Sequence, residues 1–531
     1  MVRPAATPII CVIAPLVLSL SIAPRLYAGQ AAQPARSSVG STAASRVDQA
    51  RALLDAGDLE RARASVDAAL AQDPSLAEAH YLLGVLAERR QDLPAAAASF
   101  AAAIRYAPAM AEAHDRRGFV LGQQGNTTEA LKGFARAVQL APSFFDAQYH
   151  LGATRWWTRD PQGALAPLEA AVKLRPRHAE TRYYLGLTLE ALGDRQRAIV
   201  HLREAVRLSP QLAVAQARLG VALGAGGDLD GAIRHLEAAV RIDTSLPDSQ
   251  NSLALALTQA GRGDEAVSLL EKLVQARPAF LPARLNLGTA LMQQGQLGEA
   301  VAVLTALLDR DPANAEALYN LGVARKQMDE FGEAEMHLRK AASLDPKLPE
   351  APFTLGVVLW QTGRPEEALQ QFREAVARKP DYAQAHFMSG VILKQQGAIA
   401  EAIDRFRAAV TFDPSSAEAH LSLGRALAQA GQDDAAAAEL ARADELTRRT
   451  AAGQASAFAV SVGKQKAKAG DYAAAIQQFR EALRLAAENP QAHYQLALAL
   501  RHTGRVAEAR MHFAEARRLA PALDDASGET R

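Results

Sequence analysis

The sequence predicts an all-α fold, an α-solenoid of about fourteen helix-turn-helix repeats of 34 residues each. One observation is that ten prolines are separated by multiples of 34 residues, at positions 74, 108, 142, 176, 210, 278, 312, 346, 380 and 414. A second is that 49% of the residues are apolar but only 5% aromatic, so Ala and Leu, which favour helix, build the interior. A third is that 531 residues show no change of composition that would separate unrelated domains.

Small residues mark where the two helices of each repeat cross. When the repeat is counted from Ala43, position 8 is Gly in eleven copies, position 20 is Ala in all fourteen, and position 27 is Ala in twelve. Two helices approach closely only where the facing position has almost no side chain. Position 24 is Leu or Phe in thirteen copies, as in Phe100 and Phe372, and we expect it to fill the space beside this crossing.

Helix ends recur with the same period. Gly at position 15, as in Gly57 and Gly363, is expected to end the first helix, and Pro at position 32 is expected to end the second. Each repeat therefore reads as helix, turn, helix.

The N-terminal segment differs from the repeats. Arg3 is the single positive charge ahead of an apolar stretch at residues 9–22, and this arrangement within residues 1–28 is typical of a secretory signal. The alternative is an uncleaved anchor, but the stretch is short for a bilayer span and contains Pro15. Cys11 is the only cysteine, so the mature chain would have none, which is compatible with the periplasm. Residues 29–42 are expected to be a flexible linker.

The repeat array has one break. Repeats 1–12 occupy residues 43–450 and repeats 13 and 14 occupy 456–523, while residues 451–455 are an insertion. Arg448 stands where proline ends most of the other second helices. The break is therefore either a lengthened helix or a hinge, and residues 524–531 are predicted to be a polar tail.

The repeat resembles the tetratricopeptide repeat family. The family's pattern of Leu-Gly, Tyr or Leu, Ala, Phe, Ala and Pro is matched over residues 43–523. The resemblance implies a right-handed superhelix whose first helices line a concave, protein-binding groove with positions 2, 5, 9, 12 and 13. The family's usual aromatic residue at position 4 is replaced by His in several copies, including His80 and His386, which we interpret as helix-packing residues rather than metal ligands.

Aromatic and amide side chains occupy the groove positions that the resemblance implies. The candidate partner-binding aromatics are Tyr81, Tyr149, Trp156, Trp157, Tyr183, Tyr319, Phe353, Trp360 and Phe387. The candidate amides, which could hydrogen-bond a peptide backbone, are Gln293, Gln327, Gln361 and Gln395. The alternatives are that the aromatics pack beneath the neighbouring repeat and that the amides form a solvated rim. Acidic residues at position 2 could attract a basic segment or simply complement the helix dipole.

No motif indicates catalysis. The sequence contains no phosphate loop, zinc-protease pair or nucleophile elbow, so we predict no enzymatic activity, no cofactor and no metal. The run at residues 261–266 fits a dinucleotide pattern but follows a helix rather than a strand. Lys and Arg number 59 against 58 Asp and Glu, which argues against nucleic acid as a ligand.

The functional prediction is an exported, periplasmic or secreted scaffold that binds other proteins of the bacterial envelope. We expect no membrane contact in the mature form unless the signal is uncleaved. One alternative is the repeat arm of a polysaccharide synthesis or export machine with a glycan ligand. A remote alternative is a glycosyltransferase-associated repeat protein.

Overall fold

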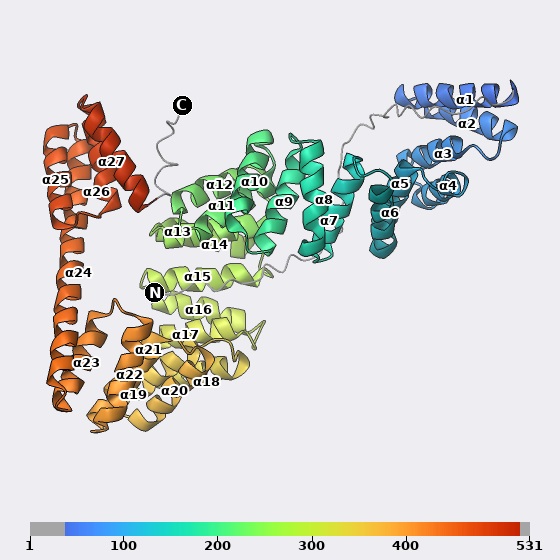
Figure 1. Cartoon of the computed structure of the whole chain (residues 1–531). Coiled ribbons are helices and arrows are strands. Elements are labelled where there is room, and N and C mark those ends of the chain that lie inside the picture. The colour runs from blue at the N-terminus through green and yellow to red at the C-terminus, as the bar shows by residue number, and fades with distance from the viewer. Residues whose placement is uncertain (1–37, 521–531) are drawn as a thin grey trace. The chain divides into compact units, whose positions relative to one another are not determined.

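The computed structural model describes residues 38–520, which form 27 α-helices joined by short turns and no strand (Figure 1). The all-α repeat solenoid predicted from the sequence is confirmed. The predicted signal, most of the predicted linker and the predicted polar tail lie outside the described residues. The first helix begins at Ser38, five residues before the first predicted repeat.

The chain divides into two compact units, Met1–Ser249 and Gln250–Arg531, and the division falls inside α13. Odd-numbered helices up to α23 are the first helices of their repeats. They are α1 (Ser38–Asp55), α3 (Ala77–Arg89), α5 (Ala111–Gln123), α7 (Phe145–Trp157), α9 (Ala179–Ala191), α11 (Ala213–Ala225), α13 (Pro247–Gln259), α15 (Leu281–Gln293), α17 (Ala315–Gln327), α19 (Glu350–Gln361), α21 (Ala383–Gln395) and α23 (Ala417–Gln429).

The second helices alternate with them along the chain. They are α2 (Leu59–Gln72), α4 (Leu93–Tyr106), α6 (Thr127–Leu140), α8 (Pro161–Leu174), α10 (Arg195–Leu208), α12 (Leu229–Ile242), α14 (Gly263–Ala276), α16 (Leu297–Leu308), α18 (Phe331–Leu344), α20 (Pro365–Arg378) and α22 (Ile399–Phe412). After them come α24 (Asp433–Lys468), α25 (Tyr472–Leu485), α26 (Pro490–His502) and α27 (Val506–Leu519).

Position 15 ends the first helix of every repeat in the left-handed backbone region. Eleven of these residues are glycine, such as Gly397 with φ of 78°, and the other three are Gln91, Arg159 and Asp329 with φ of 60° to 62°. Because side chains disfavour this conformation, glycine is the common solution. The predicted role of this position is confirmed.

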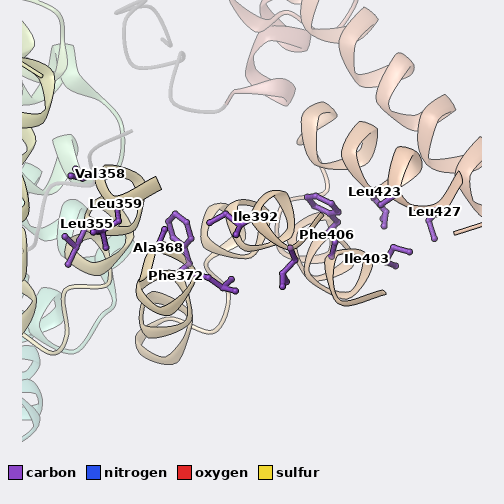
Figure 2. Close-up of a cluster of buried hydrophobic side chains, with 14 of the residues drawn as sticks. Leu355, Val358, Leu359, Ala368, Phe372, Ile392, Ile403, Phe406, Leu423 and Leu427 are labelled. Atoms are coloured by element: carbon purple, nitrogen blue, oxygen red, sulfur yellow. The ribbon is translucent and has the colours of Figure 1, made fainter. Parts of the chain in front are cut away.

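The two helices of a repeat contact each other at the small residues, as the sequence predicted. A Cβ added to Gly390 would lie 2.6 Å from Cε1 of Phe406, so the absent side chain leaves room for the ring. Phe372 and Phe406 are completely buried and belong to one apolar cluster that runs from repeat 9 into repeat 12 (Figure 2). Within the second unit, the apolar core is therefore continuous from repeat 9 to repeat 12.

In nine repeats, the side chain at position 4 links the repeat to the turn before it. The ring Nε2 atom of His386 lies 3.0 Å from the carbonyl oxygen of Pro380, and Nε2 of Gln148 donates to the carbonyl of Pro142 at 2.9 Å. Since a carbonyl can only accept, His386 carries its proton on Nε2. The same six-residue contact occurs at His80, His114, Arg182, Gln216, Arg284, His420 and His493. These histidines thus have a structural role.

Helix α24 differs from all others because it spans 36 residues and joins two repeats (Figure 1). It contains the second helix of repeat 12, the insertion at 451–455 and the first helix of repeat 13, so fourteen repeats give 27 helices rather than 28. Within residues 38–520, no helix has the length and hydropathy needed to cross a bilayer.

Candidate protein-binding surface

Four predicted aromatic residues form a half-buried strip on three consecutive first helices of the second unit. Tyr319 lies on α17, Phe353 and Trp360 lie on α19, and Phe387 lies on α21. All four pack against the apolar cluster of Figure 2 with part of their surface left exposed. We call these residues the aromatic strip.

The repeat core fixes the orientation of the rings in the strip. The Phe353 ring centroid lies 5.6 Å from that of Phe372 and 5.0 Å from that of Tyr382, and the Phe387 centroid lies 5.8 Å from that of Phe406. Val357 and Val391, at position 9, are also half-buried against the same cluster. The strip is therefore a rigid apolar surface, since most rotamer freedom of its side chains is already lost to packing.

The predicted amides lie at the ends of the same first helices. Gln293, Gln327, Gln361 and Gln395 are the last residues of α15, α17, α19 and α21, and all four are exposed. Each exposed amide can donate and accept a hydrogen bond. Their contact with a partner stays a prediction.

In the first unit, two predicted tyrosines are mostly buried rather than displayed. Tyr81 and Tyr149 are 9% and 3% exposed. Burial raises the pKa of both hydroxyls, and a hydrogen bond from Arg116 opposes the rise at Tyr81. These two rings therefore offer little surface to a partner, which matches the packing alternative stated above.

Trp156, Trp157 and Tyr183 gather around Tyr184 in the first unit. The Trp157 Nε1–H donates to the Tyr184 hydroxyl at 3.2 Å, and the Trp156 and Trp157 centroids lie 5.2 Å apart, edge to face. The Tyr183 centroid lies 5.3 Å from that of Tyr184. Trp157 is 43% exposed, so the cluster has one ring open to solvent.

Two ionic pairs lie beneath this face of the first unit. Arg116 donates to Glu88 at 3.0 Å, and burial raises the pKa of Glu88 although Arg116 opposes the rise. Nδ1 of His150 lies 2.9 Å from Asp115, which is 2% exposed. Burial lowers the pKa of His150, but the Asp115 carboxylate outweighs it, so the net pKa is raised. Both pairs lie inside the repeat stack and are structural.

Three acidic residues at position 2 already have basic neighbours. Asp146 pairs with Arg175 at 3.3 Å, Glu180 lies 3.1 Å from His178, and Glu78 pairs with Arg51. An acidic stripe available to a basic ligand is thus partly neutralised in the first unit.

Sequence reasoning missed Tyr184, Asp115 and His150, although a periodic signal connects them. Position 5 of one repeat contacts position 6 of the next, 35 residues later. Examples are Asp115 with His150, Tyr149 with Tyr184, and Asn251 with Asn286. A search for complementary side chains 35 residues apart would have identified them.

The chemistry of the strip supports binding. Across residues 38–520, no three His, Cys, Asp or Glu side chains are grouped so as to hold a metal ion. Residues 261 and 262 of the run at 261–266 lie in the turn between α13 and α14, and residues 263–266 are the first residues of α14. What the surface offers is apolar area, ring edges and exposed amides.

Two family models match the chain. The model described as the Cilia and flagella-associated protein 70 C-terminal domain matches residues 244–460. The model described as Tetratricopeptide repeat matches residues 47–113, 154–213 and 463–524. A comparison with curated proteins finds no match.

Solved structures resemble the chain at low superposition scores. Pseudomonas aeruginosa pilF is 20% identical with a TM-score of 0.37, covering 40% of this chain and 97% of its own. The Cut9–Hcn1 hetero-tetramer is 17% identical with a TM-score of 0.34, covering 85% and 95%. YrrB, described as having an unusual peptide-binding site, is 23% identical with a TM-score of 0.30, covering 34% and 92%. Scores of this size support no inference about function.

Proposed function

Because the chain is a protein of tetratricopeptide repeats, we propose that it is a non-enzymatic scaffold of the bacterial envelope that binds extended segments of partner proteins. The observation that carries this proposal is the aromatic strip on α17, α19 and α21. It combines preorganised apolar area with a row of exposed amides, which is how a surface binds a peptide without a deep pocket.

The dimensions of the strip set the length of the ligand. Packed helices lie about 10 Å apart, so a layer of three adjacent first helices is roughly 30 Å wide. An extended chain rises about 3.3 Å per residue, so about nine residues would cover the strip. Apolar side chains of the segment would meet Tyr319, Phe353 and Phe387. The glutamines, eight residues and thus about 12 Å further along each helix, would meet polar groups at the edge of the ligand.

Crosslinking from the strip tests the proposal. A photoreactive residue replaces Trp360 in the native host, and captured molecules are identified by mass spectrometry. The matched control places the same residue at Met336, which is 53% exposed on the second helix α18. We expect proteins of one envelope pathway to be captured from position 360 and not from 336. Equal capture at both positions, or none at 360, would contradict binding at the strip, and a sugar adduct would favour the polysaccharide alternative.

The envelope location rests on the predicted signal at residues 1–28. Fractionation of host cells followed by N-terminal sequencing tests it. We expect a periplasmic or secreted chain that begins near residue 28. An intact N-terminus in the membrane fraction would indicate an anchor, and an intact chain in the cytoplasm would contradict export.

A further inference from the structure

The middle of α24 stands apart from the rest of the second unit. Ala443 and Leu446 are buried where the helix packs with α23, and Ser456 and Val460 are buried where it packs with α25 and α26. Between them, no residue from 447 to 455 is buried. A helix of 36 residues is about 54 Å long, so this exposed segment is a bare strut of roughly two and a half turns.

The residues that join successive repeats elsewhere are altered on both halves of α24. Position 28 is apolar and half-buried in every other repeat that another repeat follows, but repeat 12 has the exposed Asp444 there. Position 3 is Ala, Ser or Thr in repeats 2 to 12 and in repeat 14, and there it is at most 4% exposed. Repeat 13 has Phe458 at position 3, and this ring is 72% exposed.

These substitutions exclude the regular joint at this place. A phenylalanine does not fit a contact that elsewhere admits only Ala, Ser or Thr, and an aspartate would be buried without a partner. The open helix is therefore encoded by the sequence, and its outward face is available to another molecule.

The outward face has the spacing of a helix-pairing surface. Exposed residues follow one another at intervals of four and three along α24: Ala437, Ala441, Asp444, Arg448, Ala451, Ala455 and Phe458. A repeating interval of four and three places side chains on one stripe that faces a partner helix. The stripe has small residues at both ends of an Asp–Arg centre and one large exposed aromatic ring.

We propose that this stripe is a homodimer interface in which α24 packs against α24 of a second copy in antiparallel orientation. When the two helices cross at Leu446, residues equally distant from it face one another. Asp444 of each copy then faces Arg448 of the other, and the opposite charges pair twice. A parallel arrangement would place like charges opposite one another, so charge complementarity selects both the occupant and its direction.

The remaining residues of the stripe suit this crossing. Ala441 faces Ala451, and Ala437 faces Ala455, so the two helices can approach closely on both sides of the charged centre. Phe458 then covers the turn of the second copy that carries Ala437. A two-fold interface uses the same patch on both copies, as this stripe does. The pairing is independent of the aromatic strip and would double it within one assembly.

Charge reversal and charge exchange test the pairing on the full chain. Sedimentation velocity is expected to show a reversible dimer of the 56.5 kDa chain. D444R alone and R448D alone should each raise the dissociation constant about tenfold or more, a factor equal to about 1.4 kcal/mol. The double variant D444R/R448D restores the opposite pairs and should restore dimerisation. R449D, an exposed residue outside the stripe, is the matched control and should leave the dimer unchanged.

Each result decides the proposal. A chain that stays monomeric at every concentration overturns it, as does a dimer that neither single reversal weakens. Failure of D444R/R448D to recover dimerisation, with α-helix content unchanged by circular dichroism, overturns the antiparallel crossing. Capture at the aromatic strip is measured separately, so loss of dimerisation and loss of partner binding are distinguishable.

Discussion

The chain passes from repeat 11 to repeat 12 through a turn, but it passes from repeat 12 to repeat 13 through one continuous helix. Helix α22 ends at Phe412, and Pro414 and a short turn reverse the chain before α23 packs against it. After α23, the chain forms α24 and continues without a turn through Arg448, which stands at the proline position, and residues 447–455 contain no proline and one glycine, Gly453. A few turn residues therefore decide whether neighbouring repeats pack together or are held apart by a strut.

The largest expected difference between the two regions is at position 24. Phe406→Ala should destabilise its repeat by about 3–5 kcal/mol, because the ring is completely buried. Leu440→Ala, the same position in repeat 12, should cost only about 1–2 kcal/mol, because Leu440 is half-buried and no following repeat covers it. Hydrogen exchange of the α22 and α24 amides measures both. If the two substitutions reduced stability equally, Leu440 on α24 would have to be as buried in solution as Phe406.

A proline should distinguish the strut from the turn. Arg448→Pro places proline inside α24, where it removes a helix hydrogen bond and should cost about 3 kcal/mol. Amide exchange between residues 444 and 456 is expected to accelerate strongly, while repeats 9 to 11 stay protected. Pro414→Ala is the matched control in the regular turn and should change exchange little. Unchanged protection in Arg448→Pro would show that this segment is not helical in solution.

Two glycine substitutions should have opposite signs. Gly453→Ala meets no atom within 4 Å inside α24 and should stabilise the helix by about 1 kcal/mol. Gly397→Ala changes a residue with φ of 78° in the turn before α22 and should destabilise by about 1 kcal/mol. Urea unfolding followed by circular dichroism compares them. Two changes of the same sign would contradict the backbone difference between strut and turn.

Acidification should produce the smallest effect, and it should fall on the regular repeats. Burial lowers the pKa of His201, His235 and His337, which share position 23 of their repeats, where α24 has Glu439. Because these pKa values are lower in the folded chain, the unfolded chain binds protons at a higher pH than the folded chain does. The stability that these groups contribute is present above the unfolded pKa of about 6.5 and is lost as the pH falls below it.

Thermal unfolding between about pH 7.5 and pH 5.5 checks this sign. The melting temperature is expected to fall with pH, and less so in a variant with all three histidines replaced by Gln. His150 has the opposite sign, because Asp115 raises its pKa, so it limits the loss in the first unit. A melting temperature that rises on acidification would contradict the burial of the three rings.

The repetitive part of the fold could be predicted because each position recurs in the same environment. Gly at position 8, Ala at position 20 and Phe or Leu at position 24 describe one helix crossing many times over, so each copy supports the others. Position 15 was predicted from its glycines, and the structure shows that Gln91, Arg159 and Asp329 adopt the same conformation.

The contacts between repeats were harder to predict. Whether Tyr149 or Tyr184 faces solvent depends on which positions of adjacent first helices meet, and this offset depends on the stacking geometry rather than on one helix. For Tyr81 and Tyr149 the sequence therefore left both a groove position and a packed position open, and both side chains are mostly buried. Residues 447–455 left both a helix and a hinge open, because helix-forming residues surround a single glycine.

The short range of the contacts has a kinetic consequence. The position 4 side chains bond to carbonyls only six residues earlier, and the principal helix contacts join elements one or two places apart in the chain. Little loop-closure entropy is lost before such contacts form, so each repeat can acquire structure as soon as its neighbour is present. The chain can therefore begin to fold from its N-terminus during synthesis, without waiting for its last residues.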